Sequence, residues 1–298
     1  MSAPDINTTE KVIANPSKIR DYAMFMKFRL ASLVVLSAAI GYVACSNTVD
    51  WAKMGWLILG GFLVTGSSNG FNQIIERNLD KLMDRTQNRP LPQGRMGVTE
   101  AFIIASLSGI IGVVLLWIFM NPLSGILGLL ALILYTAVYT PMKRITPFAV
   151  FVGAFPGAIP PLLGCVASTS GFGEIPFLGW ILFAGQFMWQ FPHFWSIAWV
   201  LDDDYKKAGF KMLPSGRDKS SAFQILVYTI FLYPISLFPV MFHYSGAASA
   251  FIISGCSLYF LYQAYQLYKD LTIEAARKLM FGSFLYLPLV QLAVMIGK

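Results

Sequence analysis

The chain contains nine apolar runs, most of them long enough to cross a lipid bilayer as a helix. They lie at residues 30–45, 55–75, 101–120, 123–140, 147–167, 175–200, 222–243, 246–268 and 279–297. Of the 298 residues, 56% are hydrophobic and only 12% are charged, a charged fraction about half that of an average soluble domain. Backbone polar groups in lipid must bond within their own segment, so runs of this length predict helices. We therefore expect an all-α, polytopic membrane protein built as a nine-transmembrane-helix bundle.

Several of these runs contain prolines, which remove a backbone hydrogen bond and tend to kink a helix. They are Pro156, Pro160, Pro161, Pro192, Pro234, Pro239 and Pro288. Such breaks are tolerated in lipid where they face protein or a cavity. Proline is also frequent in membrane helices generally, so the pattern leaves both explanations open. We expect a central cavity, open to the cytoplasmic side.

Lys and Arg are concentrated in the links on one side of the predicted membrane. With the N-terminus inside, the inner segments are 1–29, 76–100, 141–146, 201–221 and 269–278, and only Lys53 and Lys298 lie outside them. This asymmetry predicts an N-in, C-out protein of the bacterial cytoplasmic (inner) membrane, with its active site on the cytoplasmic side. The net charge of +7 therefore reflects topology. No nucleic-acid-binding module is visible, and we predict no nucleic-acid partner.

The chain divides into a polar N-terminal segment, 1–23, and a single membrane domain, 24–298. The first segment has no apolar core followed by a cleavage site, so a removable signal peptide is not predicted. Ile19 to Phe28 favours a short helix at the membrane interface.

The three cysteines, Cys45, Cys165 and Cys256, are isolated within apolar runs and form no C-x-x-C pair. We expect buried packing residues and no disulfide framework.

Four polar residues are spaced four apart where the second apolar run ends. They are Asn72, Glu76, Asp80 and Asp84, and on a helix they line one face. Carboxylates in one column repel each other, and a hard cation such as Mg²⁺ would offset that repulsion. A solvated loop helix is the simpler interpretation for the last two. Asn72 and Glu76 argue against it, because polar groups within an apolar span are costly and usually functional.

A second acidic cluster, Asp202 to Asp204 followed by Tyr205, ends the sixth run on the same side. It is either a solvated loop or the partner of the first cluster, in which case the two would clamp a metal-bound diphosphate. The cationic residues placed to contact such a diphosphate are Arg85, Arg89, Lys143 and Arg144.

A third motif, Trp189-Gln190-Phe191-Pro192-His193-Phe194, lies within the sixth run. His193 precedes the acidic cluster by a separation that corresponds to roughly 14 to 17 Å along a helix. A single histidine there is either a hydrogen-bonded packing residue or a site residue, and the adjacent proline favours a site.

These motifs resemble the UbiA-type superfamily of intramembrane prenyltransferases and, within it, the branch that farnesylates protoheme IX. Three signatures carry the resemblance over essentially the whole chain: Asn72-x-x-x-Glu76-x-x-x-Asp80 running on to Asp84-Arg85-Thr86-x-Asn88-Arg89-Pro90, Tyr135-x-x-x-Tyr139-Thr140-x-x-Lys143-Arg144-x-Thr146, and Trp189-Gln190-x-Pro192-His193-Phe194 with Asp204-Tyr205 and Gly209. Two positions depart from the superfamily pattern. Position 76 is Glu where Asp is usual, and Ala208 replaces the second acid of a D-x-x-x-D motif. Metal binding from the second cluster is therefore less well specified.

The resemblance implies that farnesyl diphosphate, protoheme IX (heme B) and water give heme O and diphosphate at the bilayer. The implied Mg²⁺ ligands are Asn72, Glu76, Asp80, Asp202 and Asp204, and the implied catalytic residues are Asn72, Glu76, Asp80, Asp84, His193 and Asp204. The implied substrate-binding residues are Arg85, Arg89, Tyr139, Lys143, Arg144, Trp189, Gln190, Phe194 and Tyr205. His193 has three open roles: to coordinate the heme iron, to orient the macrocycle or to handle a proton. A heme A synthase or a terminal oxidase assembly partner is an expected protein partner.

Three other functions compete with this one. A prenyltransferase for a quinone precursor or another aromatic acceptor should carry a D-x-x-x-D second motif, which is missing here. An ion-coupled transporter should place its charges near mid-membrane rather than at helix ends. A non-catalytic assembly factor leaves both acidic clusters unexplained.

Overall fold

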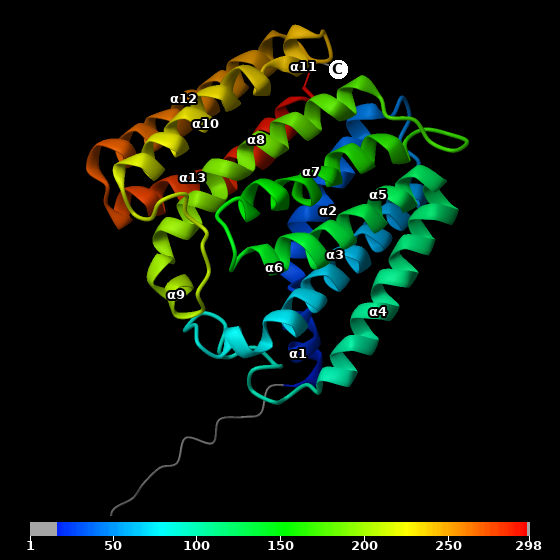
Figure 1. The fold of residues 1–298 in the computed structure, drawn as a ribbon. Coiled ribbons are helices and arrows are strands. Elements are labelled where there is room, and N and C mark those ends of the chain that lie inside the picture. The colour runs from blue at the N-terminus through cyan, green and yellow to red at the C-terminus, as the bar shows by residue number, and fades with distance from the viewer. Residues whose placement is uncertain (1–16, 297–298) are drawn as a thin grey trace, which may run out of the picture.

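The computed structural model describes residues 17–296 and contains only helices and loops within that range (Figure 1). The longer helices are α2 (Phe28–Cys45), α3 (Trp51–Asp80), α4 (Val98–Leu115), α5 (Pro122–Ile133), α7 (Ala149–Ala167), α8 (Phe177–Val200), α10 (Lys219–Ser236), α12 (Ala247–Asp270) and α13 (Ile273–Ala293). The shorter ones are α1 (Lys18–Phe25), α6 (Thr140–Met142), α9 (Asp202–Lys207), α11 (Phe238–Met241) and the π-helical turns η1 (Leu116–Met120) and η2 (Leu134–Tyr139). The expected all-α class is confirmed.

Among the described residues, six helical segments are long and apolar enough to span a bilayer. They are Phe28–Cys45, Val98–Met120, Pro122–Met142, Ala149–Ala167, Lys219–Met241 and Ala247–Asp270. Large apolar side chains such as Ile118 and Phe251 stay exposed on them, as expected where the solvent is lipid. The protein is therefore an integral membrane protein. Helices α3, α8 and α13 are of spanning length too, with 30, 24 and 21 residues, but they are not among these six.

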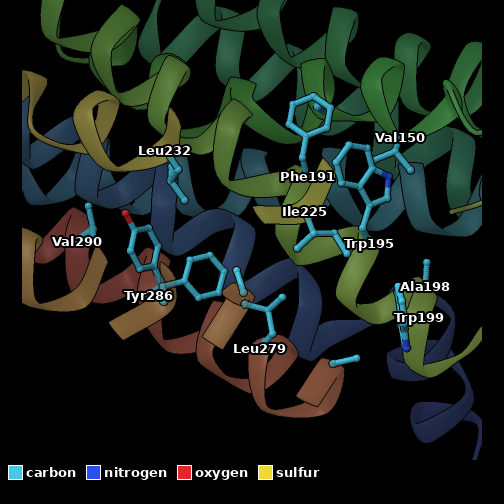
Figure 2. Packing of buried hydrophobic residues seen from close by; sticks show 14 of the residues in the cluster. Val150, Phe191, Trp195, Ala198, Trp199, Ile225, Leu232, Leu279, Tyr286 and Val290 are labelled. Carbon is cyan, nitrogen blue, oxygen red and sulfur yellow. The ribbon is translucent and has the colours of Figure 1, made fainter. Parts of the chain in front are cut away.

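Helix α8 lies at the centre of the larger hydrophobic core and packs against α7, α10 and α13. Figure 2 shows Phe191, Trp195 and Trp199 of α8 pointing into this core. A second core joins α2, α3, α5 and α7. Because α7 contributes to both cores, it links the two halves of the bundle.

One carbonyl that a helix proline leaves without its usual donor is bonded by a side chain of a neighbouring helix. Pro161 has no N–H to donate to Gly157 O, and Gln186 Nε2 donates to that oxygen instead at 2.7 Å. Gln186 Oε1 accepts in turn from Gln291 Nε2 at 2.7 Å. These two hydrogen bonds connect α7, α8 and α13 in the apolar interior.

Helices α2 and α7 approach backbone to backbone. A Cβ added at Gly41 would overlap Pro161 O, and one added at Gly164 would overlap Ala38 O. Small residues permit such close helix packing in membranes.

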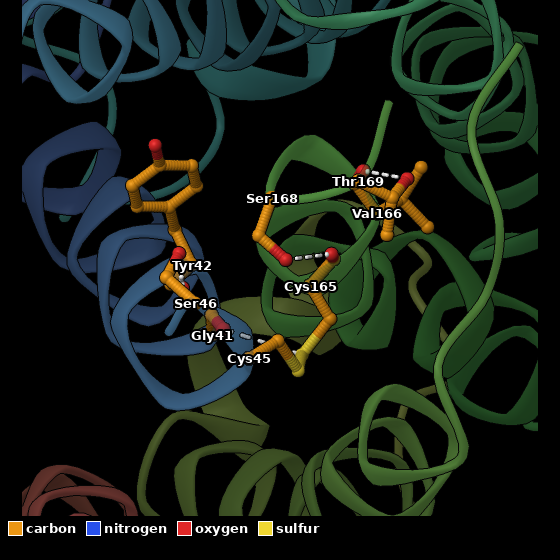
Figure 3. Close-up of a disulfide and its surroundings, with 8 residues drawn as sticks. All are labelled: Gly41, Tyr42, Cys45, Ser46, Cys165, Val166, Ser168 and Thr169. Atoms are coloured by element: carbon orange, nitrogen blue, oxygen red, sulfur yellow. Dashed lines mark hydrogen bonds between the residues drawn. A yellow bond between two sulfur atoms is a disulfide. The ribbon is translucent and has the colours of Figure 1, made fainter. Parts of the chain in front are cut away.

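The same helix pair ends in a disulfide between Cys45 and Cys165, so the expectation of no disulfide was wrong (Figure 3). The two Cα atoms lie 5.0 Å apart, but 120 residues separate the cysteines in the chain. A pairing made by tertiary packing leaves no local spacing signal. Cys256 is unpaired and half-buried, as a packing residue.

The expected short helix is present as α1 and contacts both α3 and the link that follows it. Asp21 pairs with Arg95 at 3.0 Å, and Gln73 Nε2 donates to Phe25 O at 2.6 Å. Residues 1–16 of the expected N-terminal segment, and positions 297 and 298, lie outside the described residues. Figure 1 places α1, α9 and the link after α3 at one end of the bundle.

Candidate active site

The last turns of α3 bring buried polar side chains to this end of the bundle. Asn72, Glu76 and Asp80 are 2%, 4% and 0% exposed, which is unusual for such residues without partners. The helix ends at Asp80, and Thr86 Oγ1 donates to its free carbonyl at 2.9 Å. Asp84 therefore lies beyond the helical column, and its side chain is 77% exposed. The four-residue spacing places three of the four residues on one helix face.

Each buried polar group of this face has a partner from elsewhere in the chain. Glu76 forms an ion pair with Lys143. Asp80 accepts two hydrogen bonds from Arg89 Nη1, at 2.9 and 2.8 Å. Such pairing offsets the cost of burying charge, and removing either partner would leave a buried charge uncompensated.

The residues facing Glu76 are positioned by η2 and α6. Thr140 Oγ1 donates to Tyr135 O at 2.8 Å and accepts from Asn72 Nδ2 at 3.2 Å. Lys143 Nζ lies 5.0 Å from the ring centre of Tyr139, so a cation–π contact holds it from one side. The wider π turn η2 replaces regular α-helix beside these candidate site residues, and π turns often occur at functional sites.

A cavity of about 470 Å³ opens beside Glu76 and Thr140. Arg144 lines it, as do Gly209 and Phe210 from the turn after α9. Gly209 has φ +70°, a left-handed conformation that glycine adopts without strain. The turn places the Phe210 ring 5.4 Å from Lys143 Nζ.

The second acidic segment lies directly against the link after α3. Asp204 accepts hydrogen bonds from the backbone N–H groups of Asp84 and Arg85, at 2.8 and 3.3 Å. Burial alone would raise the pKa of Asp204, but these amides and the Lys207 ammonium outweigh it and hold the pKa below its ordinary value. The Arg85 guanidinium lies 5.5 Å from the Tyr205 ring centre. The two acidic segments therefore meet at one end of the bundle.

The other two carboxylates of that segment point to different partners. Asp203 pairs with Arg217 at 2.8 Å, and Asp202 pairs with Lys206 at 2.6 Å. Among residues 17–296, no three His, Cys, Asp or Glu side chains converge as a metal-ligand group. The structure thus joins the clusters through backbone and cation contacts, not through carboxylates facing one another.

The donor set still fits a hard divalent cation. Glu76 Oε1 and Asp202 Oδ2 are buried and accept no regular hydrogen bond, and the same two oxygens form the ion pairs with Lys143 and Lys206. Carboxylate and amide oxygens are the ligands that Mg²⁺ prefers. Glu76 and Asp80, with the Asn72 amide, are the residues placed to bind one.

The side chains of the aromatic motif of α8 face two neighbouring helices, α7 and α13. Gln190 Nε2 donates to Ala154 O of α7 at 2.8 Å. Trp189 and His193 face α13 instead, with their rings stacked 4.2 Å apart. Phe194 packs edge-on against the His193 ring at 5.1 Å.

Sequence reasoning missed two residues near this site, Lys27 and Ser283. Burial, together with the positive charges of Arg89 and Lys143, lowers the pKa of Lys27 to about 7. Its position immediately before the first apolar run was the available signal. Ser283 lies 2.7 Å from His193 and carries no sequence signal of its own.

A family model described as the UbiA prenyltransferase family matches residues 33–287. The chain belongs to this family. The buried acidic face, the cationic residues opposite it and the aromatic motif thus occur in a prenyltransferase fold.

Two relatives that match over nearly the full length share one name. A Protoheme IX farnesyltransferase from Cytophaga hutchinsonii is 47% identical, over 95% of this chain and 99% of its own length. A second, from Christiangramia forsetii, is also 47% identical, with 96% of each chain covered.

Solved structures show the same fold at low identity. A structure from work on digeranylgeranylglyceryl phosphate synthase has a TM-score of 0.78 and 22% identity, covering 94% of this chain and 98% of that one. A UbiA homologue from Archaeoglobus fulgidus, bound to GPP and Mg²⁺, has a TM-score of 0.70 and 14% identity, covering 93% and 100%.

Proposed function

We propose that this chain transfers the farnesyl group of farnesyl diphosphate to a vinyl group of protoheme IX, with addition of water, giving heme O and diphosphate. The observation that carries this function is the 47% identity, over nearly the full length, to proteins named Protoheme IX farnesyltransferase. The Trp189-to-Phe194 motif is intact in the chain. A quinone-precursor acceptor is not favoured, because no D-x-x-x-D second motif is present.

Diphosphate binding is assigned to the cationic residues around the acidic face. Arg89 forms an ion pair with Asp80, and Lys143 forms one with Glu76. Arg144 lines the adjacent cavity. Arginine guanidinium and lysine ammonium groups stabilise the charge that builds on a departing diphosphate. Arg85 and Tyr205, stacked on each other, complete the rim of this site.

A divalent cation, Mg²⁺ in the relative from Archaeoglobus fulgidus, fits the same face. Glu76 and Asp80, with Asn72, would hold it, and when bound it would neutralise charge on the diphosphate oxygens. Asp204 keeps the link after α3 docked beside those residues. Its assignment as a direct ligand, and that of Asp202, stay predictions.

The transfer balances as follows. The C–O bond at farnesyl C1 breaks, and diphosphate leaves with the electron pair. The vinyl π electrons of protoheme form the new C–C bond, and water adds to the resulting cation and releases a proton. The role of this chain is to hold the diphosphate at one end of the bundle and the macrocycle beside His193, Trp189 and Phe194.

The proposed topology keeps nine spans, with the N-terminus and the active site on the cytoplasmic side of the inner membrane and a cavity open to that side. The disulfide supports it, because Cys45 ends α2 while Lys27, near the active site, precedes it. In this topology the disulfide lies at the end of the bundle away from the active site, and disulfides persist in an oxidising compartment such as the one outside the inner membrane. A heme A synthase or terminal oxidase assembly partner remains part of the proposal.

Reconstitution tests the function directly. Purified protein in lipid receives protoheme IX, farnesyl diphosphate and Mg²⁺, with a quinone precursor as competing acceptor. We expect the mass of hydroxyethylfarnesyl heme, and no product when farnesyl diphosphate is omitted. Prenylation of the quinone precursor alone would overturn the assignment.

A further inference from the structure

The His193 side chain is enclosed between α8 and α13, with its ring held from three sides. It is 7% exposed. The Trp189 ring stacks on it with an interplanar angle of 18°, and the Phe284 ring meets it edge-on at 5.1 Å. Trp189 Nε1 donates to Ser283 O at 3.0 Å, which fixes the stacking residue to α13. The imidazole therefore has a defined plane and direction.

The hydrogen bonds around Ser283 determine where the imidazole proton lies. His193 Nδ1 is 2.7 Å from Ser283 Oγ, and Ser283 Oγ is 2.6 Å from Met280 O. A carbonyl oxygen can only accept, so the single hydroxyl proton is donated to Met280 O. Ser283 Oγ then accepts from Nδ1–H. The neutral ring is thus the Nδ1–H tautomer, and the lone pair is on Nε2.

No hydrogen bond to Nε2 occurs within the part of the chain that the structure describes. An imidazole with Nδ1–H bonded to protein and a free Nε2 lone pair has the arrangement of a metal ligand. The chain's own acidic face, which suits hard cations, lies instead on α3. Under the proposed function, a planar iron-containing acceptor is the group that would use this nitrogen.

We propose that Ser283 is a positioning residue: it holds His193 in the Nδ1–H tautomer, so that Nε2 binds the iron of protoheme IX as an axial ligand. The inference rests on the proposed function for the identity of the acceptor. It assigns Ser283 a role and selects one of the roles open to His193. Loss of an outer partner of a metal-binding histidine typically weakens binding by about 10- to 100-fold.

The test measures heme binding without farnesyl diphosphate, so it is independent of turnover. Purified wild type, Ser283→Ala, Ser283→Thr and His193→Ala are titrated with protoheme IX and followed by absorbance and by resonance Raman of the ferrous form. We expect an iron–imidazole stretch in wild type that is absent in His193→Ala. Ser283→Ala should bind about 10-fold or more weakly, with that stretch shifted to lower frequency, and Ser283→Thr should restore both.

Ser249→Ala is the matched control, because Ser249 is also buried and donates from α12 to Ala293 O of α13 at 2.7 Å. It should leave heme affinity and the Raman band unchanged. A double variant distinguishes a positioning role of Ser283 from a role in packing. If Ser283 acts through His193, Ser283→Ala should cause no further loss of heme affinity in the His193→Ala background. Wild-type affinity and spectrum in Ser283→Ala would overturn the inference, as would wild type without an iron–imidazole band, even if heme O is formed. Heme ligation without any heme O would instead contradict the proposed function.

Discussion

At the scale of single residues, the buried acidic face consists of charges that compensate one another. Asp80 is fully buried, and its two hydrogen bonds come from one guanidinium nitrogen of Arg89. Glu76 and Lys143 form the second pair. Because both acids already lie beside cations, a diphosphate entering with a divalent cation would meet charges of both signs within one small region.

Replacing Asp80 tests this face. Asp80→Ala should abolish farnesyl transfer, because it removes a proposed cation ligand and leaves Arg89 without its partner. Removing one member of a buried pair costs about 3–5 kcal/mol, so detergent stability is measured alongside product formation. Asp50→Ala is the matched control: it removes a carboxylate that caps the other end of α3, and should keep turnover. Wild-type turnover by a folded Asp80→Ala protein would contradict the metal assignment.

At the scale of elements, the Asp204 carboxylate of α9 accepts hydrogen bonds from the link after α3. Asp204→Ala removes two hydrogen bonds that backbone amides donate to the carboxylate. A hydrogen bond to a charged group typically contributes about 1.5–3 kcal/mol to stability. We expect hydrogen exchange at the amides of Asp84 and Arg85 to rise about 10-fold or more. Asp203→Ala, which removes only an exposed pair with Arg217, should leave that exchange unchanged.

This contact also has a defined pH dependence. The pKa of Asp204 is lowered in the folded protein, so the contact contributes fully above the ordinary carboxyl pKa of 3.8. It is lost as pH falls through the lowered value. Exchange at the two amides should therefore stay protected across the neutral range and increase only in strong acid. Loss of protection between pH 5 and 7 would contradict the pairing.

The α2–α7 contact is tested by adding one methyl group. Gly164→Ala should destabilise the protein, because its Cβ would overlap the backbone oxygen of Ala38, which cannot move without shifting α2. We expect a loss of about 1–3 kcal/mol, measured by thermal unfolding in detergent. Gly255→Ala on α12 has open space around its Cβ and should be neutral or stabilising. Equal stability of both variants would mean that the helices separate easily.

At the scale of the whole molecule, the disulfide joins two helices that are far apart in the chain. Cys45→Ser should lower the thermal unfolding temperature, because losing a cross-link over a long loop costs about 2–5 kcal/mol. Cys256→Ser removes a free thiol and should change little. In Cys165→Ser, the freed Cys45, which is partly exposed at the end of α2, should react with an impermeant thiol reagent added on the outer side of the membrane. Labelling only in inverted vesicles would contradict the proposed orientation.

The sequence by itself determined the features that depend on local periodicity and composition. Apolar runs predicted helices in a membrane because lipid leaves the backbone few alternatives. The four-residue spacing from Asn72 to Asp80 predicted one helical face because α-helical geometry repeats locally. Motif spacing also indicated the family to which the chain belongs.

Only the tertiary structure decided which of these residues meet. Three contacts join segments that are far apart in the chain. They are the Lys143–Glu76 ion pair, the hydrogen bonds from the amides of Asp84 and Arg85 to Asp204, and the hydrogen bond between His193 and Ser283. Such contacts depend on how whole helices pack, and no spacing in the chain records them. The disulfide was missed for the same reason, since 120 residues separate two cysteines that helix packing brings together.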